Sequence, residues 1–132
     1  MRPPRASNRA SDRLVERRKR LGRGRWAELM ATALLLAKGY RILARRHVTP
    51  YGEVDIIAAR RGRIAFIEVK RRATLADAEA ALTPVQGDRI ARAADYWLSR
   101  HPAYLDREVG LDAVLVTPRG WPHHIPNALD RM

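Results

Sequence analysis

Two short apolar segments joined by a turn constrain the fold of this chain more than any other feature. Residues 54–59 and 64–70 are rich in β-branched and other apolar side chains, which favours strands, and the intervening run from Arg60 to Arg63 has turn composition. If the middle two residues of that run form the loop, Arg60 pairs with Arg63 and the register of an antiparallel hairpin is fixed. A four-residue loop gives the same register, whereas a loop of odd length gives a different one.

This register brings charged side chains together at one end of the hairpin. Counting outward from the loop places Asp55 opposite Glu68 and Glu53 opposite Lys70. Directly opposed residues share a face of the sheet with Cβ atoms roughly 5 Å apart, and like charges in such a pair repel each other. The hairpin therefore predicts two facing carboxylates with a cation between them, and Glu53 as a partner of Lys70.

The residue types suit metal-assisted hydrolysis. Carboxylate oxygens bind hard divalent cations such as Mg²⁺ or Mn²⁺. A lysine beside them can orient or deprotonate a water molecule, or offset charge that develops on phosphorus. The chain has 23 Arg and only three Lys, so a lysine at position 70 is suggestive. The alternative for an isolated Glu68-x-Lys70 pattern is a solvent-facing ion pair at a strand end.

The charge balance indicates a polyanionic partner. The sequence contains 26 Lys and Arg against 14 Asp and Glu, which gives a net charge of +12, and residues 1–25 alone hold ten basic and two acidic residues. Such an excess favours nucleic acid or an anionic membrane as the partner. The absence of cysteine excludes disulfides and thiolate metal sites.

Composition divides the chain into a tail and one domain. We expect residues 1–22 to form a basic, disordered tail, with a short helix over residues 11–21 on a partner as the alternative, and residues 23–132 to form the domain. The longest uncharged apolar stretch, residues 29–37, is far shorter than the roughly 20 residues of a membrane span. A cytoplasmic protein is expected, and an Arg-rich organelle-targeting segment is the alternative.

Periodicity and turn residues predict the order αβββαββ. We expect helices over residues 26–38 and 84–100, and strands over residues 40–48, 54–59, 64–70, 109–117 and 121–125. Gly39 should end the first helix, and residues 74–84 should form a loop with at most one helical turn. The second helix should bury one stripe made of Val85, Ile90, Ala93, Ala94, Trp97 and Leu98. This order implies a mixed central sheet flanked by helices.

Five motifs between about residue 22 and residue 129 carry a resemblance to a known family. They are Gly24-Arg25-Trp26-Ala27-Glu28, Gly39-Tyr40-Arg41-Ile42-Leu43, Gly52-Glu53-Val54-Asp55, Phe66-Ile67-Glu68-Val69-Lys70 with Arg72, and His124-Ile125-Pro126-Asn127-Ala128. In these motifs the chain resembles the YraN-like family of uncharacterised bacterial proteins. That family looks like a distant relative of Holliday-junction resolvases, within the PD-(D/E)XK nucleases. The resemblance implies a restriction-endonuclease-like α/β fold.

The resemblance also implies a role for each matching residue. Asp55 and Glu68 would hold Mg²⁺ or Mn²⁺, and the Val69 carbonyl would add a ligand. Lys70 would serve the attacking water or the transition state. Glu28 would complete the acidic set, with an exposed helix glutamate as the alternative interpretation.

Two positions depart from the family pattern. Gln86 stands where the family often has lysine, and related nucleases use glutamine there to contact the site or the phosphate. Gln86 is therefore a candidate catalytic residue, with a helix-surface glutamine as the alternative. The family favours Arg-Phe-Asp before the late strand, where this chain has Gly110-Leu111-Asp112. We interpret Asp112 as structural.

Other residues are candidates for contacts with nucleic acid. Arg71 and Arg72 follow the predicted site directly and could bind phosphate, and a solvated strand end is the alternative. Trp26, Trp97 and Trp121 could stack on bases, although aromatic side chains at helical or strand spacing belong more often to the core.

Two functions account for these residues, and a third accounts only for the charge. The first is a metal-dependent nuclease that hydrolyses DNA phosphodiester bonds, with branched DNA as one candidate substrate. The second is a nucleic-acid-binding module that keeps the nuclease fold without the chemistry. The third is a basic adaptor that docks on an anionic membrane or acidic protein through residues 1–25. Cleavage of a branched junction normally requires two active sites, so a homodimer is an open alternative to a monomer.

Overall fold

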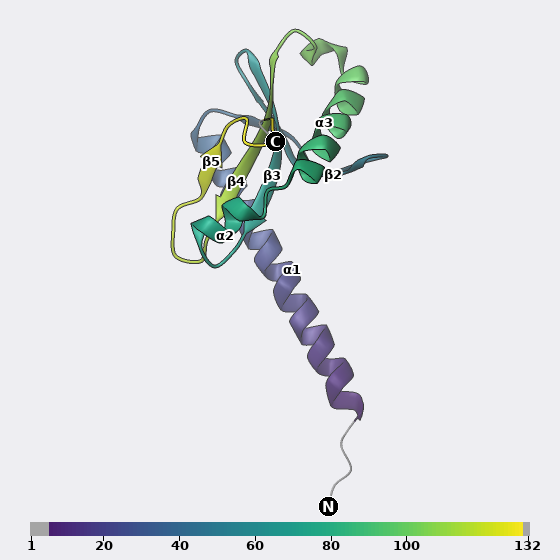
Figure 1. Ribbon diagram of the computed structural model, residues 1–132, viewed down its shortest axis with the longest axis vertical. Helices are drawn as coiled ribbons and strands as arrows, with labels where there is room; N and C mark the ends of the chain where they lie inside the picture. Colours follow the sequence, from purple (N-terminus) through teal and green to yellow (C-terminus); the bar gives the residue numbers. More distant parts are fainter. Residues whose placement is uncertain (1–5, 131–132) are drawn as a thin grey trace, which may run out of the picture.

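The computed structural model describes residues 6–130, so residues 1–5 of the predicted tail lie outside the described part of the chain. Its elements, shown in Figure 1, are α1 (Ala6–Ala37), β1 (Arg41–Thr49), β2 (Gly52–Arg60), β3 (Arg63–Arg71), α2 (Leu75–Ala80), α3 (Pro84–Ser99), the 3₁₀ turn η1 (Pro102–Tyr104), β4 (Glu108–Val116) and β5 (His123–Ile125). The predicted order is confirmed, and α2 is the helical turn expected within residues 74–84.

One mixed sheet holds all five strands in the order β1-β2-β3-β4-β5. β3 and β4 are parallel, and the other neighbouring pairs are antiparallel. Parallel neighbours need a crossover connection, which α2 and α3 provide between β3 and β4. The predicted α/β class with a mixed central sheet is therefore confirmed.

Helices cover both faces of the sheet, and the sheet separates the hydrophobic core into two clusters. Small and apolar residues of α1, among them Ala27, Ala31 and Leu35, pack on one face. The predicted stripe of α3 packs on the other face, where Ile90 and the rest of the stripe are buried. Val85 is the exception, because this residue of the first turn of α3 is 79% exposed.

The first helix is longer than the sequence pattern predicts. It begins at Ala6 rather than Trp26, so residues 6–22, which composition predicts to be disordered, are helical in the structure. We call this segment the basic arm. Figure 1 shows it running out from the sheet, clear of the other elements. The division of the chain at residue 22 stays a prediction. None of the helices within residues 6–130 combines the length and the apolarity needed to cross a membrane.

Gly39 ends α1 as expected. Its φ of 87° lies in the left-handed region, which glycine adopts without a steric penalty. The Tyr40 N–H donates to the Leu35 carbonyl at 2.9 Å, and the Gly39 N–H donates to the Leu36 carbonyl at 3.1 Å. This pair of bonds is the Schellman arrangement, and it turns the chain directly into β1.

The hairpin of β2 and β3 has the predicted register. Arg60 pairs with Arg63, which confirms the two-residue loop, and the pairing runs in step to Ile56 and Ile67. The ladder stops there, one residue before Asp55. The two strands therefore separate at the point where the predicted site begins.

Candidate active site

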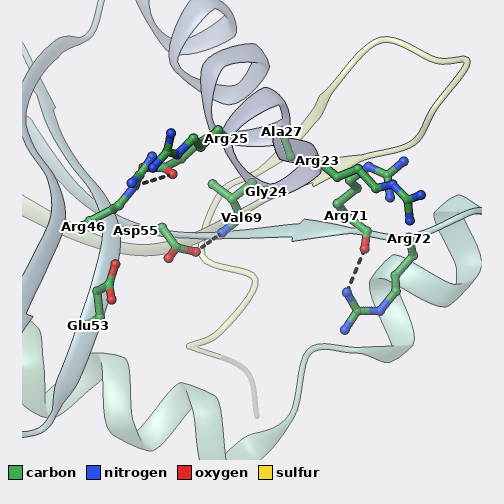
Figure 2. A pocket seen from close by; sticks show the side chains of 11 residues that line it. Arg23, Gly24, Arg25, Ala27, Arg46, Glu53, Asp55, Val69, Arg71 and Arg72 are labelled. Atoms are coloured by element: carbon green, nitrogen blue, oxygen red, sulfur yellow. Dashed lines mark hydrogen bonds and ion pairs between the residues drawn. The ribbon is translucent and has the colours of Figure 1, made fainter. Parts of the chain in front are cut away.

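A pocket lies between the start of β2, the end of β3 and the first helix. Its volume is about 720 Å³, and it is lined by Arg23, Gly24, Arg25, Ala27, Glu28, Arg46, Glu53, Asp55, Val69, Arg71 and Arg72. We call it the site pocket. Asp55 Oδ2 accepts a hydrogen bond of 2.7 Å from the Val69 N–H, so this carboxylate takes the place of the next rung of the ladder. In Figure 2, Asp55 and Glu53 lie on one side of the pocket and Arg71 and Arg72 on the other.

Glu68 and Lys70 do not line the site pocket. Side chains alternate along β3, and Ile67 and Val69 face α1. Glu68 instead lies against α3, where its Oε1 is 3.1 Å from Lys70 Nζ and 4.0 Å from Arg89 Nη2. Both side chains are mostly buried, with 10% of Glu68 and 14% of Lys70 exposed. Glu68 is still close enough to Asp55 for its charge to raise the pKa of that carboxyl, although only Asp55 lines the site pocket.

Glu28 lines the site pocket from α1. Its Oε2 accepts a hydrogen bond of 2.8 Å from Arg46 Nε on β1. Arg46 has a φ of 49°, a left-handed backbone that a non-glycine residue adopts only when its surroundings hold it there. Within residues 6–130, the buried Glu28 Oε1 has no hydrogen-bond partner. One carboxylate oxygen of Glu28 is therefore hydrogen-bonded and the other is not. Glu28 is a residue of the pocket wall, and not the exposed helix glutamate of the alternative interpretation.

The environment of Asp55 disfavours its ionised form. Burial raises the pKa of Asp55 most, and the negative charges of Glu68, Glu28 and Glu53 add to the effect. The hydrogen bond from Val69 opposes this shift, and the net result is a pKa of about 7. The surrounding protein therefore compensates the ionised form of Asp55 only in part, through the Val69 N–H.

The donor set of the site pocket fits a hard divalent cation. Asp55 and the unpartnered Oε1 of Glu28 are oxygen donors, and the negative charge around them would be relieved by a cation. Glu68 is already paired with Lys70 and Arg89. No group of three acidic or histidine side chains in the described residues converges as a metal site. Metal ligation by Glu68 and by the Val69 carbonyl stays a prediction.

Gln86 has a structural partner. Its side-chain Oε1 accepts a hydrogen bond from the Thr83 N–H, and its own N–H donates to Thr83 Oγ1, both at 3.3 Å. This reciprocal pair is the capping box that begins α3. Gln86 is not among the residues of the site pocket, and its predicted contact with substrate stays a prediction.

Sequence reasoning missed several arginines around the site. Arg46 fixes Glu28, and Arg89 approaches Glu68 from α3. No pattern in β1 distinguishes Arg46 from the adjacent Arg45. Arg89 follows Gln86 by three residues, so the two share a face of α3, and that spacing could have indicated it.

Asp112 lies apart from the site pocket in a buried network. Its two carboxylate oxygens accept hydrogen bonds of 2.7 Å from both terminal nitrogens of Arg63, and His124 Nε2 lies 2.7 Å from its Oδ2. The Asn127 N–H donates to its Oδ1 at 2.9 Å. Burial alone would raise the pKa of Asp112, but these hydrogen bonds outweigh burial and lower it to about 2. The interpretation of Asp112 as a structural acid agrees with this geometry.

We expect the stability of the metal-free protein to fall as the pH rises from about 4 to about 7. Asp55 has a folded-state pKa of about 7, above its ordinary value of 3.8, so folding favours the protonated acid and ionisation opposes it. Asp55→Asn removes this ionisation. At pH about 8 the variant should be as stable as the unmodified protein or more stable by up to about 1 kcal/mol. Chemical denaturation of both proteins across this pH range, in chelator, measures the difference.

Metal binding should reverse the order of stability of the unmodified protein and the Asp55→Asn variant. At a Mn²⁺ concentration of about 100 times its dissociation constant, the unmodified protein should gain about 2.7 kcal/mol by linkage, and Asp55→Asn should gain much less. Strong destabilisation of the metal-free variant would instead make Asp55 a satisfied structural acid.

The fold and the site define a class before any relative is considered. A mixed sheet between helices, with acidic residues where β2 and β3 separate and a Glu-x-Lys pattern on β3, is a restriction-endonuclease-like fold. The sequence profile of the uncharacterised protein family UPF0102 matches residues 27–116. The chain belongs to this family, which is the YraN-like family that its motifs resemble.

Curated relatives support the assignment over most of their length. A UPF0102 protein of Rhodopseudomonas palustris strain BisA53 is 57% identical over 104 residues, which are 79% of this chain and 80% of the relative. A UPF0102 protein of Bradyrhizobium sp. strain ORS 278 is 55% identical, with 79% and 74% covered. One from Nitrobacter winogradskyi is 53% identical, with 79% and 88% covered.

Proposed function

We propose that this protein is a metal-dependent nuclease that hydrolyses phosphodiester bonds in DNA. The observation that carries the proposal is the pair of acids in the site pocket, where burial and neighbouring carboxylates raise the pKa of Asp55 to about 7 and Glu28 Oε1 is buried without a partner in the described residues. Arg71 and Arg72 border the same pocket. Acidic oxygens beside guanidinium groups suit a divalent cation and a phosphodiester together.

Each residue has a defined part in this proposal. Asp55 and Glu28 would hold Mg²⁺ or Mn²⁺, and the cation would supply an activated water and charge stabilisation at phosphorus. Lys70 orients that water or takes its proton, with Glu68 holding the lysine in place or joining the metal ligands. Arg71 and Arg72 bind the phosphates on either side, a role for which the planar guanidinium is well suited. The cytoplasm as the location and a homodimer as the assembly complete the proposal, and a mass measurement in solution tests the dimer.

A panel of DNA substrates tests the activity. Purified protein is incubated with linear duplex, single-stranded and branched DNA, in Mg²⁺, in Mn²⁺ and in chelator. Cleavage of at least one substrate with metal and none with chelator is the expected result. Intact DNA in every arm contradicts the proposal.

The alternative function is a nucleic-acid-binding module without catalysis. The position of Glu68 and Lys70 against α3, outside the site pocket, favours this alternative. Metal-independent binding of DNA by a protein that cleaves none of the substrates would establish it.

Under either function, affinity for duplex DNA should fall steeply with salt. Each phosphate neutralised contributes a slope of about −0.9 in log K against log salt. The arm carries exposed basic residues on every side, namely Arg9, Arg13, Arg17, Arg18 and Lys19. Deleting residues 1–22 should therefore make the slope shallower by several phosphate contacts.

A matched control removes charge elsewhere. Replacing Arg60 and Arg61 by serine takes one exposed charge from the end of β2 and one from the hairpin loop, at the opposite end of β2 and β3 from the site pocket. This variant should show the same slope of log K against log salt as the unmodified protein. Equal slopes with and without residues 1–22 would show that the arm does not contact the phosphate backbone.

A further inference from the structure

A second groove adjoins the site pocket along α1. Four residues of one helix face, at helical spacing, line it together with one residue from the end of β3 and one from the turn after β4: Lys19, Gly22, Arg23, Trp26, Arg71 and Pro118. Its volume is about 450 Å³, and we call it the tryptophan groove. Arg23 and Arg71 line both the groove and the site pocket. A polymer bound at the site pocket can therefore continue into the groove.

Trp26 presents an aromatic surface to this groove. Its side chain is 40% exposed and is absent from both core clusters, although the next residue, Ala27, is buried against the sheet. Trp97 shows the contrasting case, because it is 4% exposed and packs in the core beside Phe66. The fold uses Trp97 for packing, whereas much of the Trp26 indole remains accessible to a ligand.

The charged side chains that line the groove are basic, so the groove would attract a polyanion. Lys19, Arg23 and Arg71 are basic, and none of the described residues that line the groove is acidic. The site pocket differs in that its arginines are mixed with three carboxylates. The Nε of Arg71 is buried and has no hydrogen-bond partner within residues 6–130, so this side chain would gain a hydrogen bond if it turned its Nε toward an anionic oxygen in the groove.

We propose that the tryptophan groove binds one unpaired nucleotide of a DNA strand, with its base stacked on Trp26 and its flanking phosphates held by Lys19, Arg23 and Arg71. An indole can stack on a base only when that base has left its neighbours, as in single-stranded segments, loops and ends. The proposal rests on the proposed function, and it narrows the substrate to DNA with a single-stranded segment next to the scissile phosphate.

Binding in chelator tests this proposal independently of cleavage. The probes are a fluorescein-labelled oligothymidine of about 12 nucleotides, a length within the usual range of single-strand sites, and a duplex of equal length. Trp26→Ala should weaken single-strand binding by about 5- to 140-fold, the range that base stacking on an aromatic side chain contributes. Trp26→Phe should restore most of it, and duplex binding should change less than about twofold in both variants.

Trp121 provides the matched control, because it is a tryptophan that is 84% exposed and lies outside the groove. Trp121→Ala should bind both probes like the unmodified protein. A second measurement does not depend on truncating Trp26: in Trp121→Phe protein, oligothymidine should quench the tryptophan emission, and further replacement of Trp26 by Phe should abolish the quenching.

Two results would overturn the proposal: equal single-strand affinity in Trp26→Ala, or quenching that survives the loss of Trp26. Failure of the nuclease proposal is a separate result. A protein that cleaves nothing but loses single-strand affinity in Trp26→Ala supports the groove without the chemistry. A protein that cleaves DNA but shows no effect of Trp26 supports the chemistry without the groove.

Discussion

Replacing Lys70 with alanine should lower metal-dependent cleavage of DNA by about 10²- to 10⁴-fold, the range that a positioned acid-base group contributes. Lys70 Nζ lies 3.1 Å from Glu68 Oε1, and only 14% of its side chain is exposed. The carboxylate of Glu68 holds this enclosed amine in one position, which suits Lys70 to orienting a water molecule. Glu68→Ala should cause a loss of similar size, because the carboxylate either positions Lys70 or binds the metal. The measurement is the single-turnover rate on the best substrate of the panel.

Two matched variants separate the role of the lysine from its charge. Lys70→Arg keeps a positive charge but cannot accept a proton near neutral pH, so it should stay inactive if Lys70 acts on the water. Recovery of activity in Lys70→Arg would limit Lys70 to charge balance. Lys38→Ala removes an exposed lysine outside the site pocket and should retain full activity. Unchanged cleavage by Lys70→Ala would remove this residue from the mechanism.

Arg63→Met should destabilise the fold by about 3 to 5 kcal/mol, the cost of leaving a buried charge without its partner. Asp112 is fully buried, and Arg63 supplies two of its hydrogen bonds at 2.7 Å. Methionine fills much of the space of the arginine side chain but cannot neutralise the carboxylate. The free energy of unfolding at neutral pH, from chemical denaturation, measures the loss.

Gly110→Ala probes the same ion pair from the neighbouring strand. A Cβ at position 110 would lie 2.0 Å from Arg63 Nη2 and 2.6 Å from Asp112 Oδ1, so the guanidinium would have to move away. The absence of a side chain at Gly110 therefore provides the space that the Arg63 guanidinium occupies. In the Arg63→Met background, the alanine should cost much less than it does alone. Additive costs in this double-mutant cycle would show that the two positions act independently.

The same ion pair should make the unmodified protein sensitive to acid. The pKa of Asp112 is about 2 in the folded state, below its ordinary value of 3.8. The stability that it contributes is therefore complete above about pH 4 and is lost as the pH falls toward 2. Unfolding curves between these values should show a smaller acid loss in Arg63→Met, whose Asp112 lacks the main group that lowers its pKa.

The hairpin could be predicted from sequence because the residues that determine its register are close together in the sequence. The turn composition at Arg61 and Gly62 sets the loop length, the loop length sets the register, and Arg60 does pair with Arg63. The order of elements and the mixed sheet follow from the same kind of short-range pattern. The buried stripe of α3 was also predicted, apart from Val85, whose place in the first turn leaves it beyond the edge of the core.

The candidate site was predicted in composition but not in arrangement. Counting along the hairpin assumes that the ladder continues to Asp55 and Glu68, whereas the strands separate one residue earlier and Asp55 bonds to the Val69 N–H. No sequence pattern reports where a ladder ends. Arg46 on β1 pairs with Glu28, and Arg89 on α3 approaches Glu68; both arginines come from distant elements, and only packing of the whole domain brings them near.

The continuity of α1 has a geometric consequence for any variant with a different N-terminus. One uninterrupted helix carries both the basic arm and Glu28 of the site pocket. Each residue inserted between them would advance the arm by about 1.5 Å and rotate it by about 100° about the helix axis. Added length displaces the arm only slightly, but added rotation turns its basic residues to another side of the molecule. Helical phase, more than length, therefore constrains this part of the chain, and insertions of about seven residues, close to two full turns, would preserve it.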